Sequence, residues 1–137
     1  MPSERLTTMH TPGVPDITDD TFAAEVLAAD RPVLVKFTAD WCPGCRQLGP
    51  VLGAIAAERA DRLKVVQLDA DHHPATTAAH GVLALPTLIL FDAGQPVLRL
   101  VGSRSRQRLL REIDAAWEAH REGGAAQKPP SMLTKRE

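Results

Sequence analysis

A short apolar run in the first third of the chain constrains the fold most strongly. The run, "PVLVKFTA" at residues 32–39, is rich in Val and Phe and contains one charged residue, Lys36. Such a run is typical of a strand that is buried on both faces of a sheet. We therefore expect a central sheet that is covered by helices on both sides.

Helical spacing of apolar residues recurs on either side of this run. It predicts one helix over residues 16–30, one from residue 42 onward and a last one over 104–120, while Pro74 and Gly81 indicate the start and end of a short helix over 72–81. In the first of these, Asp16 and Thr18 are residue types that cap helices, and Phe22, Val26 and Leu27 fall on one face.

Strand patterns alternate with these helices. Residues 63–71 predict one strand, and residues 83–102 predict two strands joined by a turn at Ala93-Gly94. Pro15 restricts any strand before the first helix to a sheet edge. The resulting order, βαβαβαββα, predicts a mixed sheet with parallel strands and a closing antiparallel hairpin.

The length and net charge of the chain limit its domain organisation and the kinds of partner it is expected to attract. Its 137 residues fit one domain with length to spare, and we expect a flexible arm at 1–12, a domain at 13–121 and a disordered tail at 122–137. The formal net charge is −1, so no strong field favours nucleic acid or a membrane surface. With no apolar run long enough for a membrane span and no leader-like start, a cytoplasmic location is expected.

The chemistry of the chain is concentrated in "WCPGCR", which holds its only two cysteines. Cys42 follows the central strand at the start of a helix, where free N–H groups and the helix dipole stabilise a thiolate. Pro43 fits the first helical position, and Cys45 returns to the same side of the helix. Two thiols so placed predict disulfide exchange: Cys42 attacks, and Cys45 then displaces the substrate.

Two other interpretations of the cysteines remain open at this stage. They could be inert buried residues, or they could belong to a metal site. A zinc site needs about four ligands, and the chain has no second cysteine pair. His72, His73 and His80 are expected on the surface. The pair beside a strand–helix–strand pattern favours redox chemistry.

These motifs resemble the thioredoxin family over residues 16–117. The matching segments are "VLVKFTADWCPGCRQLGPVL", which carries Trp-Cys-x-x-Cys, and "VVQLDADHHPATTAAHGVLALPTLILFDAGQPV". The resemblance implies the thioredoxin fold, an α/β fold with a mixed central sheet and helices on both faces.

The resemblance also implies roles for individual residues. Cys42 would be the nucleophile and Cys45 the resolving thiol, with Trp41, Pro43 and Gly44 around them. Pro86 would be a cis-proline that presents the backbone of Leu85 to an extended substrate and keeps metals off the thiols. Gly102 matches a glycine before the last helix.

The chain departs from the family pattern around the cysteines. The dipeptide between them is Pro-Gly rather than Gly-Pro, an order that resembles less reducing relatives. Lys36 stands where thioredoxins usually bury an Asp, Gln67 where a Lys often pairs with that Asp, and Thr38 where Trp is common. Lys36 could reach solvent along its stem, stabilise thiolates as a cation, or accept a proton when neutral.

We therefore expect a cytoplasmic, monomeric protein-disulfide reductase that draws electrons from a thioredoxin-reductase-like flavoprotein. The Cys42–Cys45 disulfide would be its redox centre, with no bound cofactor and no metal. The alternatives are a disulfide oxidase or isomerase, and a thioredoxin-fold binding module with little turnover.

Overall fold

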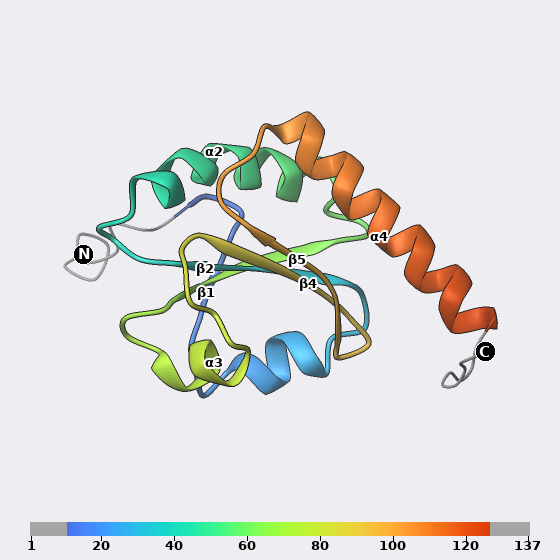
Figure 1. The fold of residues 1–137 in the computed structure, drawn as a ribbon, viewed down its shortest axis with the longest axis horizontal. Helices are drawn as coiled ribbons and strands as arrows, with labels where there is room; N and C mark the ends of the chain where they lie inside the picture. Colours follow the sequence, from blue (N-terminus) through green and yellow to red (C-terminus); the bar gives the residue numbers. More distant parts are fainter. Residues whose placement is uncertain (1–10, 127–137) are drawn as a thin grey trace.

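The computed structural model describes residues 11–126 of the chain, and Figure 1 shows their arrangement. Nine elements follow one another in the order that the sequence predicted. They are β1 (Asp16–Ile17), η1 (Ala23–Leu27), β2 (Val33–Thr38), α2 (Pro43–Glu58), β3 (Lys64–Asp69), α3 (Pro74–Ala79), β4 (Thr87–Asp92), β5 (Gln95–Val101) and α4 (Arg106–Ala126).

The five strands form one mixed sheet in the order β1-β3-β2-β4-β5. β1 and β2 both pair with β3 in parallel, whereas β4 pairs antiparallel with β2 and with β5. β2 is therefore the central strand, and all six of its residues are buried. This confirms the interpretation of residues 32–39 as a strand covered on both faces.

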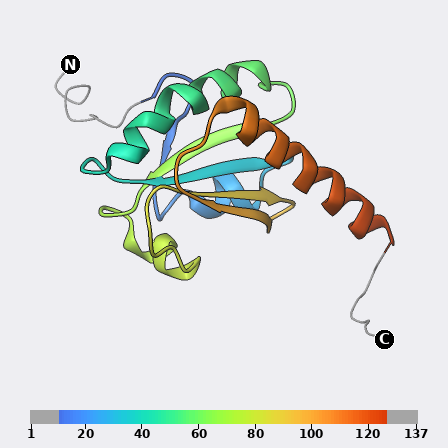
Figure 2. The ribbon, with the colours of Figure 1, turned by 45° about the horizontal axis from the view of Figure 1, so that its top comes forward.

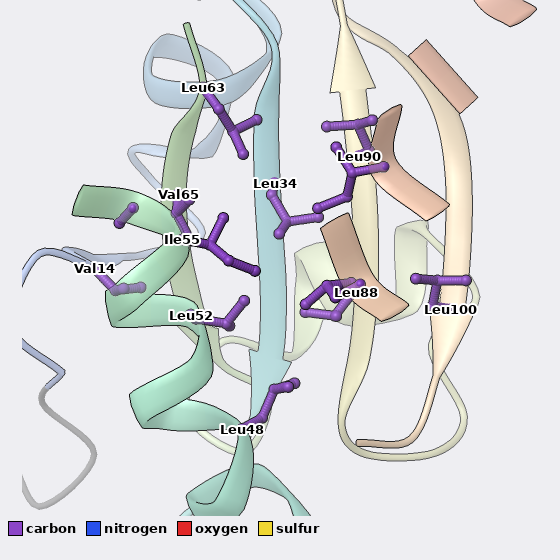
Figure 3. Close-up of a cluster of buried hydrophobic side chains, with 13 residues drawn as sticks. Val14, Leu34, Leu48, Leu52, Ile55, Leu63, Val65, Leu88, Leu90 and Leu100 are labelled. Carbon is purple, nitrogen blue, oxygen red and sulfur yellow. The ribbon is translucent and has the colours of Figure 1, made fainter. Parts of the chain in front are cut away.

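Helices cover both faces of this sheet. α2 and α4 lie over one face, and η1 and α3 lie over the other (Figures 1 and 2). Because side chains alternate along a strand, β2 serves both layers. Leu34 joins the apolar cluster under α2 and α4, while Val33, Val35 and Phe37 join the cluster under η1 and α3. Figure 3 shows the first cluster, in which Leu34 lies between leucines of α2 and β4.

The closing hairpin has the predicted turn. Ala93 and Gly94 connect β4 to β5, and both have positive φ angles, of 53° and 81°. A side chain at Gly94 would come within 3.0 Å of the Leu27 carbonyl oxygen. Glycine thus meets two demands here, the left-handed backbone and the close approach of a neighbouring segment.

The first helix differs from the prediction. Asp16 and Ile17 pair with β3 as the edge strand β1, and the helical segment is a short π turn with an Ala28 N–H to Ala23 carbonyl bond of 2.9 Å. Thr18 still accepts a bond from the Thr21 N–H. Phe22 and Val26 are buried as expected, but Leu27 is exposed, since the wider π turn breaks the expected helical spacing.

The domain boundaries remain predictions at both ends. The last helix begins at Arg106 and continues to Ala126, so it extends past residue 122, where the tail was expected to begin. Residues 1–10 of the expected arm and 127–137 of the expected tail lie outside the described residues. No helix within residues 11–126 is both long enough and apolar enough to cross a membrane.

Candidate active site

The predicted pair of cysteines lies at the junction of β2 and α2. Cys42 is the N-cap residue of α2, with an extended backbone, and Pro43 takes the first helical position. The Cys42 Sγ accepts a hydrogen bond from the Cys45 N–H at 3.2 Å. The sulfur of Cys42 therefore occupies the place of a capping oxygen, where a free N–H and the dipole of a 16-residue helix stabilise negative charge.

Cys42 and Cys45 form a disulfide, and their Cα atoms are 5.2 Å apart. The first turn of α2 sets this distance, because residues three apart lie on the same side of a helix. Cys45 is completely buried, and Cys42 keeps 3% of its surface exposed. The pair is thus a closed redox couple at a helix N-terminus.

Pro86 packs against this loop from the start of β4. The Leu85–Pro86 peptide bond is cis. A Cβ atom added to Gly44 would lie 3.3 Å from the Pro86 Cδ, so the glycine allows a close approach of the two segments. The Gly102 N–H donates to the Pro86 carbonyl oxygen at 2.9 Å, and Gly102 has a φ of 97°. The structure brings Gly44, Pro86 and Gly102 together, and Leu85 lies half-buried beside them.

Trp41 precedes the disulfide and is 64% exposed. Its indole N–H donates to the Asp71 carboxylate at 2.8 Å, which anchors the ring to the loop after β3. A large, anchored apolar ring that stays exposed beside a reactive sulfur is suited to contact with a partner. The motif predicted Trp41, whereas only the fold brings Asp71 to it.

Lys36 lies beneath the site and not in solvent. Its side chain is 1% exposed, and its Nζ donates to the Cys45 carbonyl oxygen at 2.8 Å. Burial lowers the pKa of Lys36 to about 8, and the charge of Asp16 opposes part of that shift. Of the three possibilities for this residue, exposure of the amine along the stem is therefore wrong.

Asp16 and Gln67 also lie near the site, and the sequence alone gave neither of them a role there. In the sheet, Asp16 is opposite Gln67 and Gln67 is opposite Lys36, so the three lie in one row across β1, β3 and β2. The Gln67 amide donates to the Asp16 carboxylate at 2.7 Å. Asp16 was interpreted as a helix cap, and only the strand register reveals its place in this row.

The histidines do not form a metal site in the described part of the chain. Within residues 11–126, no three His, Cys, Asp or Glu side chains lie close enough to hold a metal ion. His72 is exposed and pairs with Asp69, whose hydrogen bond raises the pKa of His72. His80 differs from the expectation of a surface residue, since its ring packs against Phe22 and Phe91.

These features define a class of protein. A dithiol at a helix N-terminus, on a mixed five-stranded sheet and beside a cis-proline, is the arrangement that the thioredoxin resemblance implied. Thiolate attack, a mixed disulfide and attack by the second thiol are the chemistry that two such cysteines can perform.

Comparison with known proteins indicates the same class of protein. The family profile described as Thioredoxin matches residues 13–115. The thioredoxin of Mycobacterium tuberculosis (strain ATCC 25618 / H37Rv) is 50% identical over 97 residues, which cover 71% of this chain and 84% of that protein. The thioredoxin of Mycolicibacterium smegmatis is 46% identical over 102 residues, 73% of this chain and 91% of that protein.

A third relative joins two activities in one chain. The bifunctional thioredoxin reductase/thioredoxin of Mycobacterium leprae (strain TN) is 44% identical over 98 residues, 72% of this chain and 21% of that protein. The chain described here belongs to the thioredoxin family. It is a thiol-disulfide oxidoreductase that works by dithiol-disulfide exchange through its Cys42–Cys45 pair.

Proposed function

We propose that the protein reduces disulfides of other proteins, with Cys42 as the nucleophile and Cys45 as the resolving thiol. The observation that carries this assignment is the position of the Cys42 sulfur at the N-cap of α2, where it accepts the Cys45 N–H. The helix end stabilises a thiolate at Cys42, while Cys45 is fully buried beside it.

The surroundings of the pair are assigned to substrate binding. Trp41 offers an exposed ring, Pro43 and Gly44 form the loop between the sulfurs, and Pro86 faces that loop. The backbone of Leu85 would pair with an extended segment of the substrate, as strands do at open sheet edges. Gly102 supports this arrangement through its bond to the Pro86 carbonyl.

Electrons would come from a thioredoxin-reductase-like flavoprotein. The fusion of both activities in the Mycobacterium leprae relative supports this partner. The disulfide itself serves as the redox centre, so no further cofactor takes part. We place the protein in the cytoplasm, because thiol pools there are kept reduced by such systems. We expect it to act as a monomer.

Variants of the two cysteines test the assignment. Cys42→Ser should abolish reduction of a disulfide-bonded test protein such as insulin, with dithiothreitol as the electron source. Cys45→Ser should retain the first attack and accumulate mixed disulfides, visible on a non-reducing gel. If the wild type accumulates mixed disulfides to the same extent, then Cys45 does not resolve them, and a binding module with little turnover fits better.

The reduction potential of the pair distinguishes the direction of electron flow. Equilibration against glutathione should give a value near −270 mV, roughly that of a reductase. The buried amine of Lys36 favours the alternative, since a cation near the sulfurs stabilises the reduced thiolate form. A value of about −180 mV or higher would support an oxidase or isomerase instead.

A further inference from the structure

Lys36 is the most unusual side chain in the described core. It is the only lysine among the fully buried side chains of residues 11–126, and burial of lysine is rare without a paired charge. Its amine has no carboxylate within ion-pair distance in that part of the chain. The amine instead donates to the carbonyl oxygen of Cys45 at 2.8 Å, so it is fixed next to the residue that carries the second sulfur.

The strands on either side of β2 place uncharged residues opposite Lys36. On its face of the sheet, β4 contributes the apolar Leu88, and β3 contributes the uncharged Gln67. α4 adds apolar side chains such as Leu109, and α2 adds the two sulfurs.

Two carboxylates of the neighbouring strands β1 and β3 also lie on this face. Asp16 of β1 occupies the same row, bonded to Gln67, and its charge acts on the amine. Asp69 lies two residues beyond Gln67 along β3, and its carboxylate is engaged by His72. Neither forms an ion pair with Lys36 among residues 11–126, so Cys45 is the one residue there with a titratable side chain to which the amine is directly bonded, through its backbone carbonyl oxygen.

We propose that Lys36 and the Cys45 thiol share one proton, and that Lys36 accepts this proton when Cys45 attacks the mixed disulfide. The proposal rests on the roles assigned above to Cys42 and Cys45. It gives this chain a basic proton acceptor beneath the disulfide, at the position where the family resemblance implied an acid. Geometry carries it: the amine is buried, is bonded to the Cys45 backbone and has no ion pair with any of residues 11–126.

The proposed step transfers one proton and exchanges one disulfide bond for another. The proton leaves the Cys45 sulfur for the neutral amine, and the thiolate attacks the Cys42 sulfur. The Cys42–Cys45 bond forms, and the bond from Cys42 to the substrate sulfur breaks. The substrate sulfur leaves with the electron pair as a thiolate and takes up a proton, while the cysteine pair has lost two electrons.

The ionisation of Lys36 agrees with such a role. Burial lowers its pKa to about 8, so about a tenth of the amines are neutral at pH 7 and most are neutral at pH 9. An amine near this pKa can both accept and return a proton at physiological pH.

The second step can be measured by itself with 5,5′-dithiobis(2-nitrobenzoate). Mixed with the fully reduced full-length protein, this disulfide reacts with Cys42 and releases one coloured thiolate. Attack by Cys45 then releases the second, at a rate independent of reagent concentration. The rate of this second phase, followed by stopped-flow absorbance from pH 6 to 10, reports the availability of the Cys45 thiolate.

Lys36→Met removes the amine and keeps the length and burial of the side chain. We expect the second phase at pH 7 to slow by about tenfold or more, and its midpoint to move to higher pH, because loss of a nearby cation disfavours the thiolate form of a thiol. Lys64→Met is the matched control. Lys64 lies on β3 in an ion pair with Glu25, and its removal should leave the second phase within about twofold of the wild type.

Asp16→Asn provides an independent test, in which the midpoint of the second phase should move in the opposite direction. Its carboxylate favours the charged form of Lys36, so its removal should shift the midpoint of the second phase to lower pH. Asp16 is exposed, so the substitution leaves the core intact. Should Lys36→Met fail to fold by circular dichroism, this shift decides the question.

Two outcomes overturn the inference. One is a pH profile of Lys36→Met that coincides with the wild type within twofold, and the other is a profile of Asp16→Asn without a shift. Failure of the proposed function looks different. In that case the wild type itself shows no second phase, and the roles of Cys42 and Cys45 fall together with the role of Lys36.

Discussion

The two faces of the central sheet are built differently, although the same strand supplies both. Towards η1 and α3, β2 presents only apolar side chains, those of Val33, Val35 and Phe37, to a hydrophobic cluster. Towards α2 and α4 it presents Leu34 and then Lys36, which lies in a row with Gln67 and Asp16. The first face is built to bury surface, and the second also carries polar groups to the disulfide.

The difference indicates that the buried Lys36 amine lowers the stability of the fold and places a polar group beneath the disulfide. Burial of Val and Phe side chains contributes roughly 1.5–3 kcal/mol each. A buried amine costs free energy unless it is well compensated, and Lys36 has one hydrogen bond and no ion pair among the described residues. A protein that used its sheet only as a scaffold would place an apolar residue there.

The largest effect is expected from a change on the apolar face. Phe91 is 1% exposed, and its ring meets Phe22 edge to face at 5.6 Å. Phe91→Ala should lower the free energy of unfolding by about 3–5 kcal/mol, because it leaves a cavity that this packed face cannot fill. Urea denaturation followed by circular dichroism measures the loss.

The same variant should leave the redox chemistry unchanged. Phe91 lies on the face of β4 away from Lys36 and the sulfurs, so the reduction potential of folded Phe91→Ala should match the wild type. A shift of that potential would contradict the separation of the two faces.

A smaller effect of opposite sign is expected on the polar face. Lys36 has a pKa of about 8 in the folded protein and an ordinary value of 10.5, so the unfolded chain binds more protons between these limits. Stability of the wild type should therefore rise with pH across this window. At pH 7 both states are charged and the full cost applies, so Lys36→Met should be more stable by about 3 kcal/mol.

Measurement of unfolding at several pH values checks this prediction. The advantage of Lys36→Met should be constant below about pH 8 and should shrink to nearly nothing by about pH 10.5. Lys64→Met again serves as the control, since its partly exposed ion pair predicts a small loss and no gain. A Lys36→Met protein that is less stable than the wild type at pH 7 would show that the amine stabilises the fold.

The smallest effect concerns the helices that cover the polar face. Arg59 at the end of α2 forms two hydrogen bonds with Asp114 of α4, at 2.8 and 3.1 Å. This pairing lowers the pKa of Asp114 below 3.8. Asp114→Asn should cost less than about 1 kcal/mol at pH 7, because the carboxylate is half-exposed and water screens the pair.

The pH dependence of this pair has the opposite direction to that of Lys36. A carboxyl group with a lowered pKa stabilises the fold above its ordinary pKa, and the contribution is lost as the pH falls through the folded value. The gap between wild type and Asp114→Asn should therefore close below about pH 3.8. An equal gap at pH 7 and pH 3 would assign the effect to packing.

Much of the fold could be predicted because it depends on local signals. The apolar run of β2, the spacing of α2 and the Ala93-Gly94 turn each act over a few residues, and all were confirmed. The first helix was not predicted correctly. Its residues 16 and 17 satisfy their backbone by pairing with β3, a partner about 50 residues away that no local pattern reveals.

The sequence by itself determined the reactive pair and its place at a helix start, since spacing and helix geometry suffice to bring Cys42 and Cys45 together. It also determined the order of strands and helices. The tertiary structure alone decided that Lys36 is buried against Cys45, and that Asp16 and Gln67 continue its row. Burial and strand register depend on segments that are distant in sequence, and they turn an ordinary lysine into one whose pKa is about 8.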